Sequence, residues 1–444
     1  MQSSMQDDAT RRRLGRAVLF ILQQAPTVTN PVVRADIATL LLAGQAMDFA
    51  TKLQGHGSQV SGALAREYAR QGGLGERDLL NEVLPKLKKA DVVDYRLDTD
   101  GKLLHVDEFV GVTSNVIEQT FQVLHLLNPS DPELAVLHSV EIAAWAPLAE
   151  SQHLDQITRR GLGDAAAAAG LRLALAVGIN RRIPSAELSE DVIFNPHVWG
   201  TGQVKIAEFL RNLPPNERDV LLGLCEQASS RPGILVDQLG AAPSVLASAR
   251  KVGLVQAATV KSSLGGGRSK TYVFSPLSQT EDDLRTTTEA LHLRKLFVAH
   301  ILFGKEQAEA WGGRIQSPTV LVRALLDRGQ VGPASNIATD YHLVEAHGIV
   351  RVEETNDGRG VLKLIKKEVV EGGLDWLTAH VGNMPTGGPV GVNLRHAPGT
   401  FVTPEGDRAA IPDDAAADEV TRSAVLSLRE EAQRAARLDS PFGF

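Results

Sequence analysis

The chain has 444 residues and a formal net charge of −7, with 43% hydrophobic and 22% charged residues. These values are typical of a folded protein with a sizeable core, and the length allows about three domains. The single cysteine, Cys225, excludes an internal disulfide framework and predicts a reducing compartment, the cytoplasm. No apolar run reaches the roughly 20 residues that cross a bilayer, so no membrane partner is expected.

The first segment has three arginines followed by a short apolar run, an order shared with signal peptides. Asp7 and Asp8 precede these arginines, and no small-residue cleavage site follows. The segment therefore predicts an amphipathic helix.

The first predicted domain, residues 1–112, combines helices with one hairpin. Apolar residues keep a helical period through 11–72. From Glu76 to Glu108, a helix is followed by a strand, a turn at Asp98 to Gly101 and a returning strand.

The second predicted domain, residues 113–200, is expected to be a helical domain. Helices are expected over Ser114 to Leu127, Pro132 to Trp145 and Asp164 to Val177, after which Pro184 breaks the pattern. Phe194, Pro196, His197 and Trp199 then form an aromatic loop. It could stack a base, but anchoring one domain on another is the better explanation because no cation lies nearby.

The third predicted domain, residues 201–280, contains a positive island from Gly240 to Ser275. The island has no Asp or Glu, although the chain as a whole is acidic. A surface of this kind favours polyanions. Its cations are Arg250, Lys251, Lys261, Arg268 and Lys270.

The same island has a recognisable order of elements. Pro243 opens a helix that Gly253 ends, a strand follows, and a Gly-rich basic loop leads to a second strand, TYVF. This order resembles the winged-helix DNA-binding superfamily. The resemblance implies that the helix enters the major groove and that the loop, called the wing, lies along the phosphates.

The fourth predicted domain, residues 281–378, repeats that order between Ser317 and Ile365. Aligning the helix ends of the three hairpins places Asp91, Gly253 and Gly348 in register. The predicted fold class is therefore mainly α with small antiparallel hairpins, in which several winged-helix-like domains are joined by a helical region. Residues 379–444 are expected to form a flexible arm and a C-terminal helix, which could supply a dimer interface.

No pattern for enzyme chemistry emerges, so the chain is expected not to be an enzyme and to carry no cofactor or metal. The Gly-rich loop ends in Lys270-Thr271 but has Leu264 and Ser269 where a P-loop needs glycine. The histidines have no metal-binding spacing, and G-x-S-x-G does not occur.

The predicted function is double-stranded DNA binding, as a bacterial-type regulator or a DNA-loading subunit in the nucleoid. The chain would act as a homodimer or as a subunit of a larger complex. Two alternatives stay open. One is a multi-winged-helix interaction scaffold in a chromosome-segregation or anti-phage defence complex, and the other is a regulator with a ligand pocket in the helical region 114–177. The predicted DNA contacts are Ser244, Ser248, Arg250 and Lys251 on the exposed side of the helix, and Lys261, Gly266, Arg268 and Lys270 in the wing.

Overall fold

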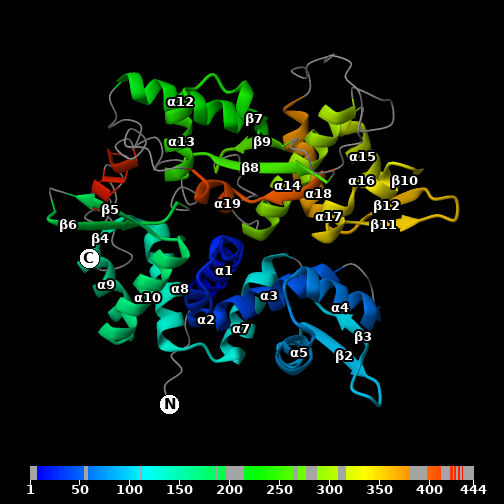
Figure 1. Ribbon diagram of the computed structural model, residues 1–444, viewed down its shortest axis with the longest axis horizontal. Helices are drawn as coiled ribbons and strands as arrows, with labels where there is room; N and C mark the ends of the chain where they lie inside the picture. The colour runs from blue at the N-terminus through cyan, green and yellow to red at the C-terminus, as the bar shows by residue number, and fades with distance from the viewer. Residues whose placement is uncertain are drawn as a thin grey trace.

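The computed structural model describes residues 8–54, 59–110, 113–185, 188–196, 215–263, 269–276, 288–308, 317–380, 398–411 and parts of 421–433. Residues 8–194 and 215–411 form two halves that lie against each other (Figure 1). The protein is mainly helical, with small antiparallel sheets of three or four strands, as the sequence predicts.

Unit 1, residues 38–108, contains the first predicted hairpin. Its helices present Met47, Phe49 and Leu84 to one apolar core with Val93 and Val106 of the hairpin. The elements are α3 (Ala38–Leu53), β1 (Val60–Ser61), α4 (Gly62–Gln71), α5 (Glu76–Asp78), η2 (Leu79–Val83), α6 (Leu84–Lys89), β2 (Val93–Leu97) and β3 (Leu103–Glu108).

Unit 2, residues 131–194, corrects the expectation of an all-helical region. It ends in a hairpin whose first strand contains Pro184, the residue expected to mark a break. Proline is tolerated there because this strand lies at the edge of its sheet. The elements are α8 (Asp131–Trp145), β4 (Leu148–Ala149), α9 (Glu150–Thr158), α10 (Asp164–Val177), β5 (Arg181–Ser185) and β6 (Glu190–Phe194).

Unit 3, residues 215–274, holds the basic island. The predicted helix begins at Pro243 and ends at Gly253, and both predicted strands form. The elements are α12 (Pro215–Ser230), β7 (Ile234–Leu235), η4 (Val236–Gln238), α13 (Pro243–Val252), β8 (Gln256–Ser262) and β9 (Ser269–Phe274).

Unit 4, residues 318–364, contains the last hairpin, also as predicted. Tyr341, Val344 and Ile349 are buried in a core shared with the long helix that precedes the unit. The elements are α15 (Pro318–Arg328), β10 (Gln330–Ala334), α16 (Ile337–Asp340), α17 (His342–Ala346), β11 (Val350–Glu354) and β12 (Gly360–Leu364).

Within the described residues, all four units share one topology. Each has a helix, a short strand, two further helical segments and a hairpin, and the short strand pairs with the returning strand of the hairpin. The strand orders are β1-β3-β2, β4-β6-β5, β7-β9-β8 and β10-β12-β11. The sequence predicts three of these units and misses unit 2.

The turn from the last helix into the hairpin has the same backbone conformation in every unit. Asp91, Gly178, Gly253 and Gly348 have φ of 55°, 80°, 88° and 66°. This left-handed conformation ends a helix and favours glycine. The predicted register of Asp91, Gly253 and Gly348 agrees with it.

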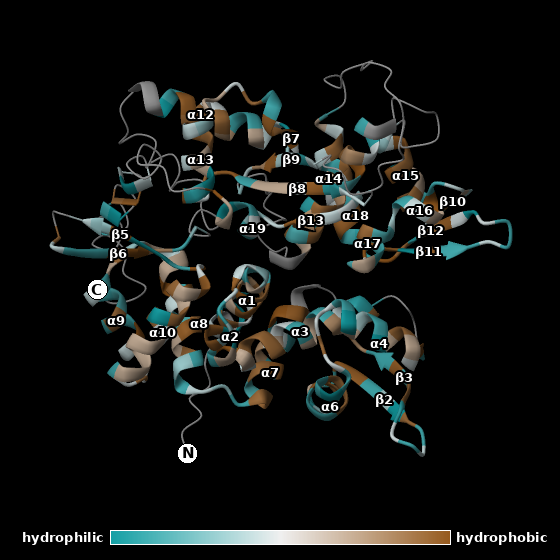
Figure 2. Ribbon diagram, in the orientation of Figure 1, coloured by the Kyte–Doolittle hydropathy of each residue, from teal (hydrophilic) through white to brown (hydrophobic). Residues whose placement is uncertain are grey.

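Longer helices connect the units and form the centre of each half. Apolar residues of α14 face the cores of units 3 and 4, whereas those of α1 pack on unit 2, so brown segments line the inside of both halves in Figure 2. These connecting elements are α1 (Asp8–Gln24), η1 (Ala25–Thr27), α2 (Pro31–Asp36), α7 (Thr113–Leu127), α14 (Thr288–Ala308) and α18 (Lys367–Thr378).

The C-terminal region is not only an arm. β13 (Pro398–Val402) adds a strand to unit 3 by pairing with β8, and α19 (Pro404–Ala409) packs against it. Val425 is buried among Ile183, Val192 and Phe194 of unit 2. The part of the predicted C-terminal helix that the structure describes thus packs on its own chain.

Candidate functional site

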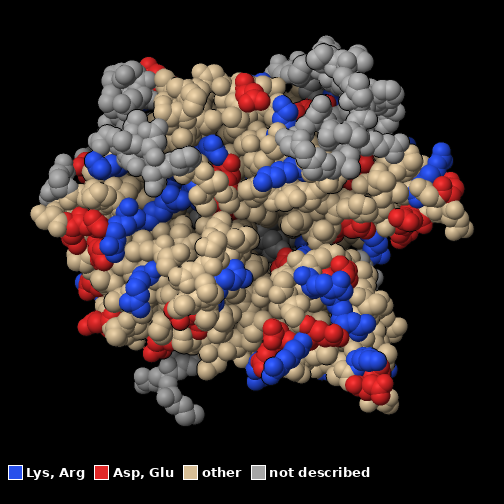
Figure 3. All heavy atoms as spheres, viewed as in Figure 1, with Lys and Arg blue, Asp and Glu red and all other residues tan. Residues whose placement is uncertain are grey.

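A groove of about 1110 Å³ lies between units 2 and 3 and the C-terminal segment. Among the described residues, its lining carries one acid, Glu150, and five cations drawn from α10, β5, α13 and the C-terminal segment. In a chain of net charge −7 this is a strong local excess of positive charge. Figure 3 shows Lys and Arg atoms gathered near β5. The five cations are Arg172, Arg181, Arg182, Lys251 and Arg422.

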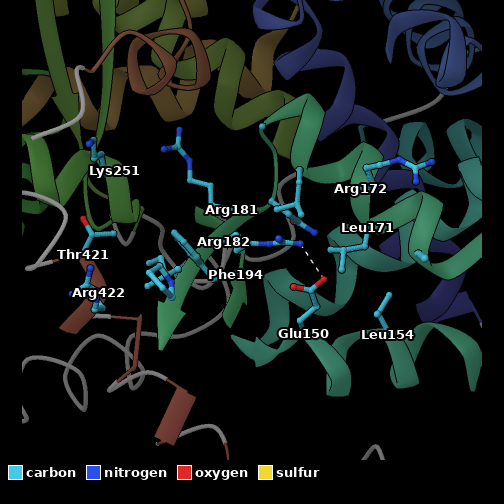
Figure 4. A pocket seen from close by; sticks show the side chains of 16 residues that line it. Glu150, Leu154, Leu171, Arg172, Arg181, Arg182, Phe194, Lys251, Thr421 and Arg422 are labelled. Atoms are coloured by element: carbon cyan, nitrogen blue, oxygen red, sulfur yellow. Dashed lines mark hydrogen bonds and ion pairs between the residues drawn. The ribbon is translucent and has the colours of Figure 1, made fainter. Parts of the chain in front are cut away.

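The side chains approach the groove from opposite sides. Lys251, Thr421 and Arg422 lie on one side and Arg172 on the other, with Arg181 and Arg182 between them (Figure 4). Arg172 and Arg182 are exposed, Arg181 and Arg422 are half-buried, and Lys251 is buried. The arrangement can hold an anion between two units of the fold.

The helix-to-strand turn of unit 2 positions the two consecutive arginines. α10 ends at Gly178 in the left-handed conformation, and the amide N–H of Asn180 donates to the carbonyl of Ala174. β5 then starts at Arg181, so the chain enters the sheet directly at the groove. The turn fixes where both guanidinium groups begin.

A buried hydrogen-bond network holds the same turn from behind. Asn180 Nδ2 donates to Ser139 Oγ at 2.9 Å, and Asn195 Nδ2 donates to Asn180 Oδ1 at 3.1 Å. Ser139 Oγ also lies 2.8 Å from His153 Nε2. These polar groups tie α8, α9 and both ends of the hairpin together.

Ser139 and His153 form a serine–histidine pair, but its environment is a core. Both side chains are fully buried. Burial lowers the pKa of His153 to about 3, so the imidazole is neutral at physiological pH. A substrate would not reach the hydroxyl, and we assign the pair to the support of Asn180.

Acids hold one groove cation in place. Arg182 lies 3.0 Å from Glu150 and 3.5 Å from Asp191, through its Nη2 and Nε atoms respectively. Glu150 lines the groove, whereas Asp191 does not. All three side chains are substantially exposed, so each pair contributes little to stability and mainly orients the guanidinium.

The floor of the groove is apolar. Leu171 and Phe194 are buried beneath it, and Leu154, Leu175 and Pro184 keep part of their surface accessible. A polar rim over an apolar floor is typical of sites for organic ligands. The groove includes part of the helical region 114–177, where the sequence left a ligand pocket open.

The predicted recognition helix is covered rather than exposed. Ser248 is 1% exposed and donates its hydroxyl to the carbonyl of Ser244, and Lys251 is 4% exposed. Arg250 Nε donates to Asp407 Oδ2 of α19 at 2.8 Å. The expectation that Ser248 and Lys251 face outwards is therefore wrong: both residues are buried, and Lys251 lies at the groove between units 2 and 3, a contact that helical periodicity alone does not show.

The predicted wing is described only in part. Lys261 is exposed on β8, and Lys270 on β9 lies 3.8 Å from Asp237. Gly266 and Arg268 lie outside the described residues. The cations of the basic island thus point to separate places: Arg250 to α19, Lys251 to the groove and Lys261 to the surface.

The aromatic loop forms an inter-unit contact at its described end. The carbonyl of Pro196 approaches Gly253 so closely that a Cβ there would lie 2.2 Å from the oxygen. Phe194 is buried. These contacts agree with anchoring of unit 2 on unit 3, while His197 and Trp199 lie outside the described residues.

Other candidate chemistry finds no site in the part of the chain that the structure describes. No group of His, Cys, Asp and Glu there could hold a metal ion. Cys225 is buried, and burial raises its pKa to about 12, so it is no nucleophile. None of the described helices combines the length and apolar character that a membrane span requires.

Sequence reasoning missed most of the groove. Arg181 and Arg182 are adjacent, but Arg172 and Arg422 are far apart in the chain and meet only through packing. The sequence feature that could have indicated unit 2 is the glycine at Gly178, which ends a helix as Gly253 does.

Comparison of the chain with protein-family models, curated proteins and solved structures gives no match.

Proposed function

We propose that the protein binds nucleic acid, with double-stranded DNA as its main partner, and that the cationic groove is the centre of the contact. The observation that supports this proposal is the convergence on one groove of five basic side chains from separate regions, with one acid among the described lining residues. Arginine side chains pair well with phosphate oxygens, and each phosphate contact releases counterions.

The repeated topology supports the same proposal. We infer that the four units are winged-helix-like modules, since each places a helix before a two-stranded hairpin. In unit 3 the helix itself is covered, so the contact would run along the groove and the exposed Lys261. Fold alone does not decide function, so the proposal depends on the cations that line the groove.

Three matched double variants test where DNA binds. Arg172→Ala with Arg182→Ala removes exposed groove cations, Lys261→Ala with Lys270→Ala removes wing cations, and Lys88→Ala with Lys89→Ala removes exposed cations of α6. Fluorescence anisotropy at several salt concentrations measures binding. The groove variant should lose the most affinity and reduce the salt slope by up to about two units.

The α6 variant is the control for net charge, since it removes the same two charges from unit 1. Equal losses in all three variants would show that only net charge matters and would contradict a groove-centred site. A larger loss of DNA affinity in the wing variant would indicate that DNA contacts the predicted wing.

The second candidate is an interaction scaffold. It is favoured by one observation, the ion pair of Arg250 on α13 with Asp407 on α19. In this candidate Arg250 binds α19 and does not contact bases. Absence of DNA binding by the purified full chain, even at low salt, would decide for the scaffold.

A further inference from the structure

The groove combines two kinds of surface that duplex DNA would not use together. Its rim is cationic, and its floor offers the partly exposed Leu154, Leu175 and Pro184. A duplex presents phosphates outwards and keeps its base faces stacked inside, so it would contact the rim and leave the floor unused. A single strand offers phosphates and unstacked base faces at once.

The size of the groove also favours a single strand over a duplex. A volume of about 1110 Å³ lies near the upper end of small-ligand sites and holds a few nucleotides at most. A duplex lying across the rim would bridge this space without entering it. The cations stand on both sides of the floor, with Arg181 and Arg182 between them, so a strand that passes through would meet charge on either side (Figure 4).

We propose that the groove between units 2 and 3 binds a single-stranded segment of nucleic acid, with phosphates on the arginine rim and bases on the apolar floor. This inference rests on the proposed function and narrows its substrate to DNA with a single-stranded end or gap. Leu154 and Leu175 provide the base contact. Arg172 and Arg182 provide the phosphate contact at the exposed end.

The test compares three fluorescent probes of equal phosphate number: a blunt duplex, a duplex with an oligothymidylate extension of about six nucleotides, and a single strand. The extension should raise the affinity of the full chain at least about tenfold over the blunt duplex at physiological salt. Leu154→Gln with Leu175→Gln should abolish this gain without changing net charge, and Arg172→Ala with Arg182→Ala should reduce it.

Two controls keep the result interpretable. Leu104→Gln changes an exposed leucine of β3 and should leave the gain intact. If the double leucine variant does not fold, Pro184→Ser changes an exposed floor residue and takes its place, with a smaller expected loss of gain. Tripolyphosphate should displace the strand far less well than unlabelled oligothymidylate, because it carries charge without bases.

The outcomes separate the two proposals. Equal affinity for blunt and extended duplexes, a gain insensitive to the floor variants, or equal displacement by tripolyphosphate would overturn the single-strand site and leave DNA binding standing. No binding of any probe would overturn both. A gain that disappears only in the groove variants supports the site.

Discussion

Units 2 and 3 have the same topology and the same glycine turn, yet their outer strands have different surroundings. In unit 3 the outer strand β8 pairs with β13, and Arg250 of α13 pairs with Asp407 of α19. In unit 2 the outer strand β5 lies at the edge of its sheet, and its arginines face the groove. The shared fold therefore does not determine which unit exposes its cations. The segments that pack on the edge of each sheet determine it.

The comparison also reverses the prediction from sequence. The island in unit 3 has five cations and no Asp or Glu, but the fold directs these cations to different places. Unit 2 looks unremarkable in sequence and supplies Arg172, Arg181 and Arg182. Charge counted along the chain predicts a binding surface only when the fold keeps that charge on one side.

The largest expected effect is a difference in the free energy of unfolding between alanine variants of the glycine turns of units 2 and 3. Gly253→Ala places a Cβ 2.2 Å from the carbonyl oxygen of Pro196, whereas a Cβ at Gly178 would lie 3.5 Å from Gln24 Nε2. Both substitutions force alanine into a left-handed conformation, which costs about 1–2 kcal/mol. We expect Gly178→Ala to cost that amount and Gly253→Ala at least about 3 kcal/mol because of the added clash.

Urea denaturation of both variants measures these free energies of unfolding. Equal costs would show that unit 2 and unit 3 do not approach each other at Pro196. A smaller cost for Gly253→Ala would contradict the close contact altogether.

The next effect concerns acid and the network behind the unit 2 turn. His153 is fully buried, and burial lowers its pKa to about 3 from the ordinary value of 6.5. The unfolded chain then binds a proton that the folded chain does not, so stability is complete above pH 6.5 and falls as the pH decreases towards 3. The loss is about 1.4 kcal/mol per pH unit for one such histidine.

His153→Gln should therefore weaken the decrease in stability between about pH 6.5 and pH 5 by up to about 1.4 kcal/mol per unit. The decrease would not vanish, because His300 is also buried and its pKa is lowered to about 3 by burial. His125→Gln, at an exposed position of α7 away from this network, is the control for replacing a histidine. An unchanged slope in His153→Gln would mean that the imidazole is charged in the fold.

The third effect tests the cover over unit 3. The side chains of Arg250 and Asp407 are 19% and 10% exposed. Asp407→Asn leaves the guanidinium without its carboxylate, and we expect a cost of about 1–3 kcal/mol, less than for a fully buried pair. Combining it with Arg250→Met should cost less than the sum of the single changes.

A double-mutant cycle measured by urea denaturation gives the coupling between the two side chains. Strict additivity would show that α19 is not held on α13 by this pair. In that event Asp407 would not keep Arg250 from contacting a ligand, although Ser248 and Lys251 would remain buried.

Much of the fold can be predicted from the sequence because helix period, strand alternation and turn residues suffice to specify the hairpins. The helix from Pro243, its end at Gly253 and the two strands that follow all form where helix period and strand alternation place them. Unit 2 was missed because Pro184 argues against a strand, although an edge strand accepts it.

The site was not readable, for a different reason. Periodicity shows that one side of α13 faces its own unit, but it does not show that α19, some 150 residues later, covers Arg250 on another side. Likewise, Arg172 and Arg422 share a groove only because the C-terminal segment packs on unit 2 through Val425. Such contacts depend on tertiary packing, which leaves no local signal.

The smallest expected effect distinguishes whether charge within the groove or the net charge of unit 2 determines the affinity for the extended duplex. Glu150→Gln and Asp191→Asn each remove one acid that pairs with Arg182, at 3.0 Å and 3.5 Å, and each raises the net charge of the chain by one. Only Glu150 lines the groove. We therefore expect Glu150→Gln to strengthen binding of the extended duplex about two- to threefold, which corresponds to about 0.4–0.7 kcal/mol, and Asp191→Asn to have a smaller effect. Both pairs are partly exposed to solvent, so each variant should change the free energy of unfolding by less than about 1 kcal/mol. Equal gains in affinity would show that the ligand senses unit 2 as a whole. A loss for Glu150→Gln would mean that this carboxylate holds Arg182 in the orientation that binds phosphate.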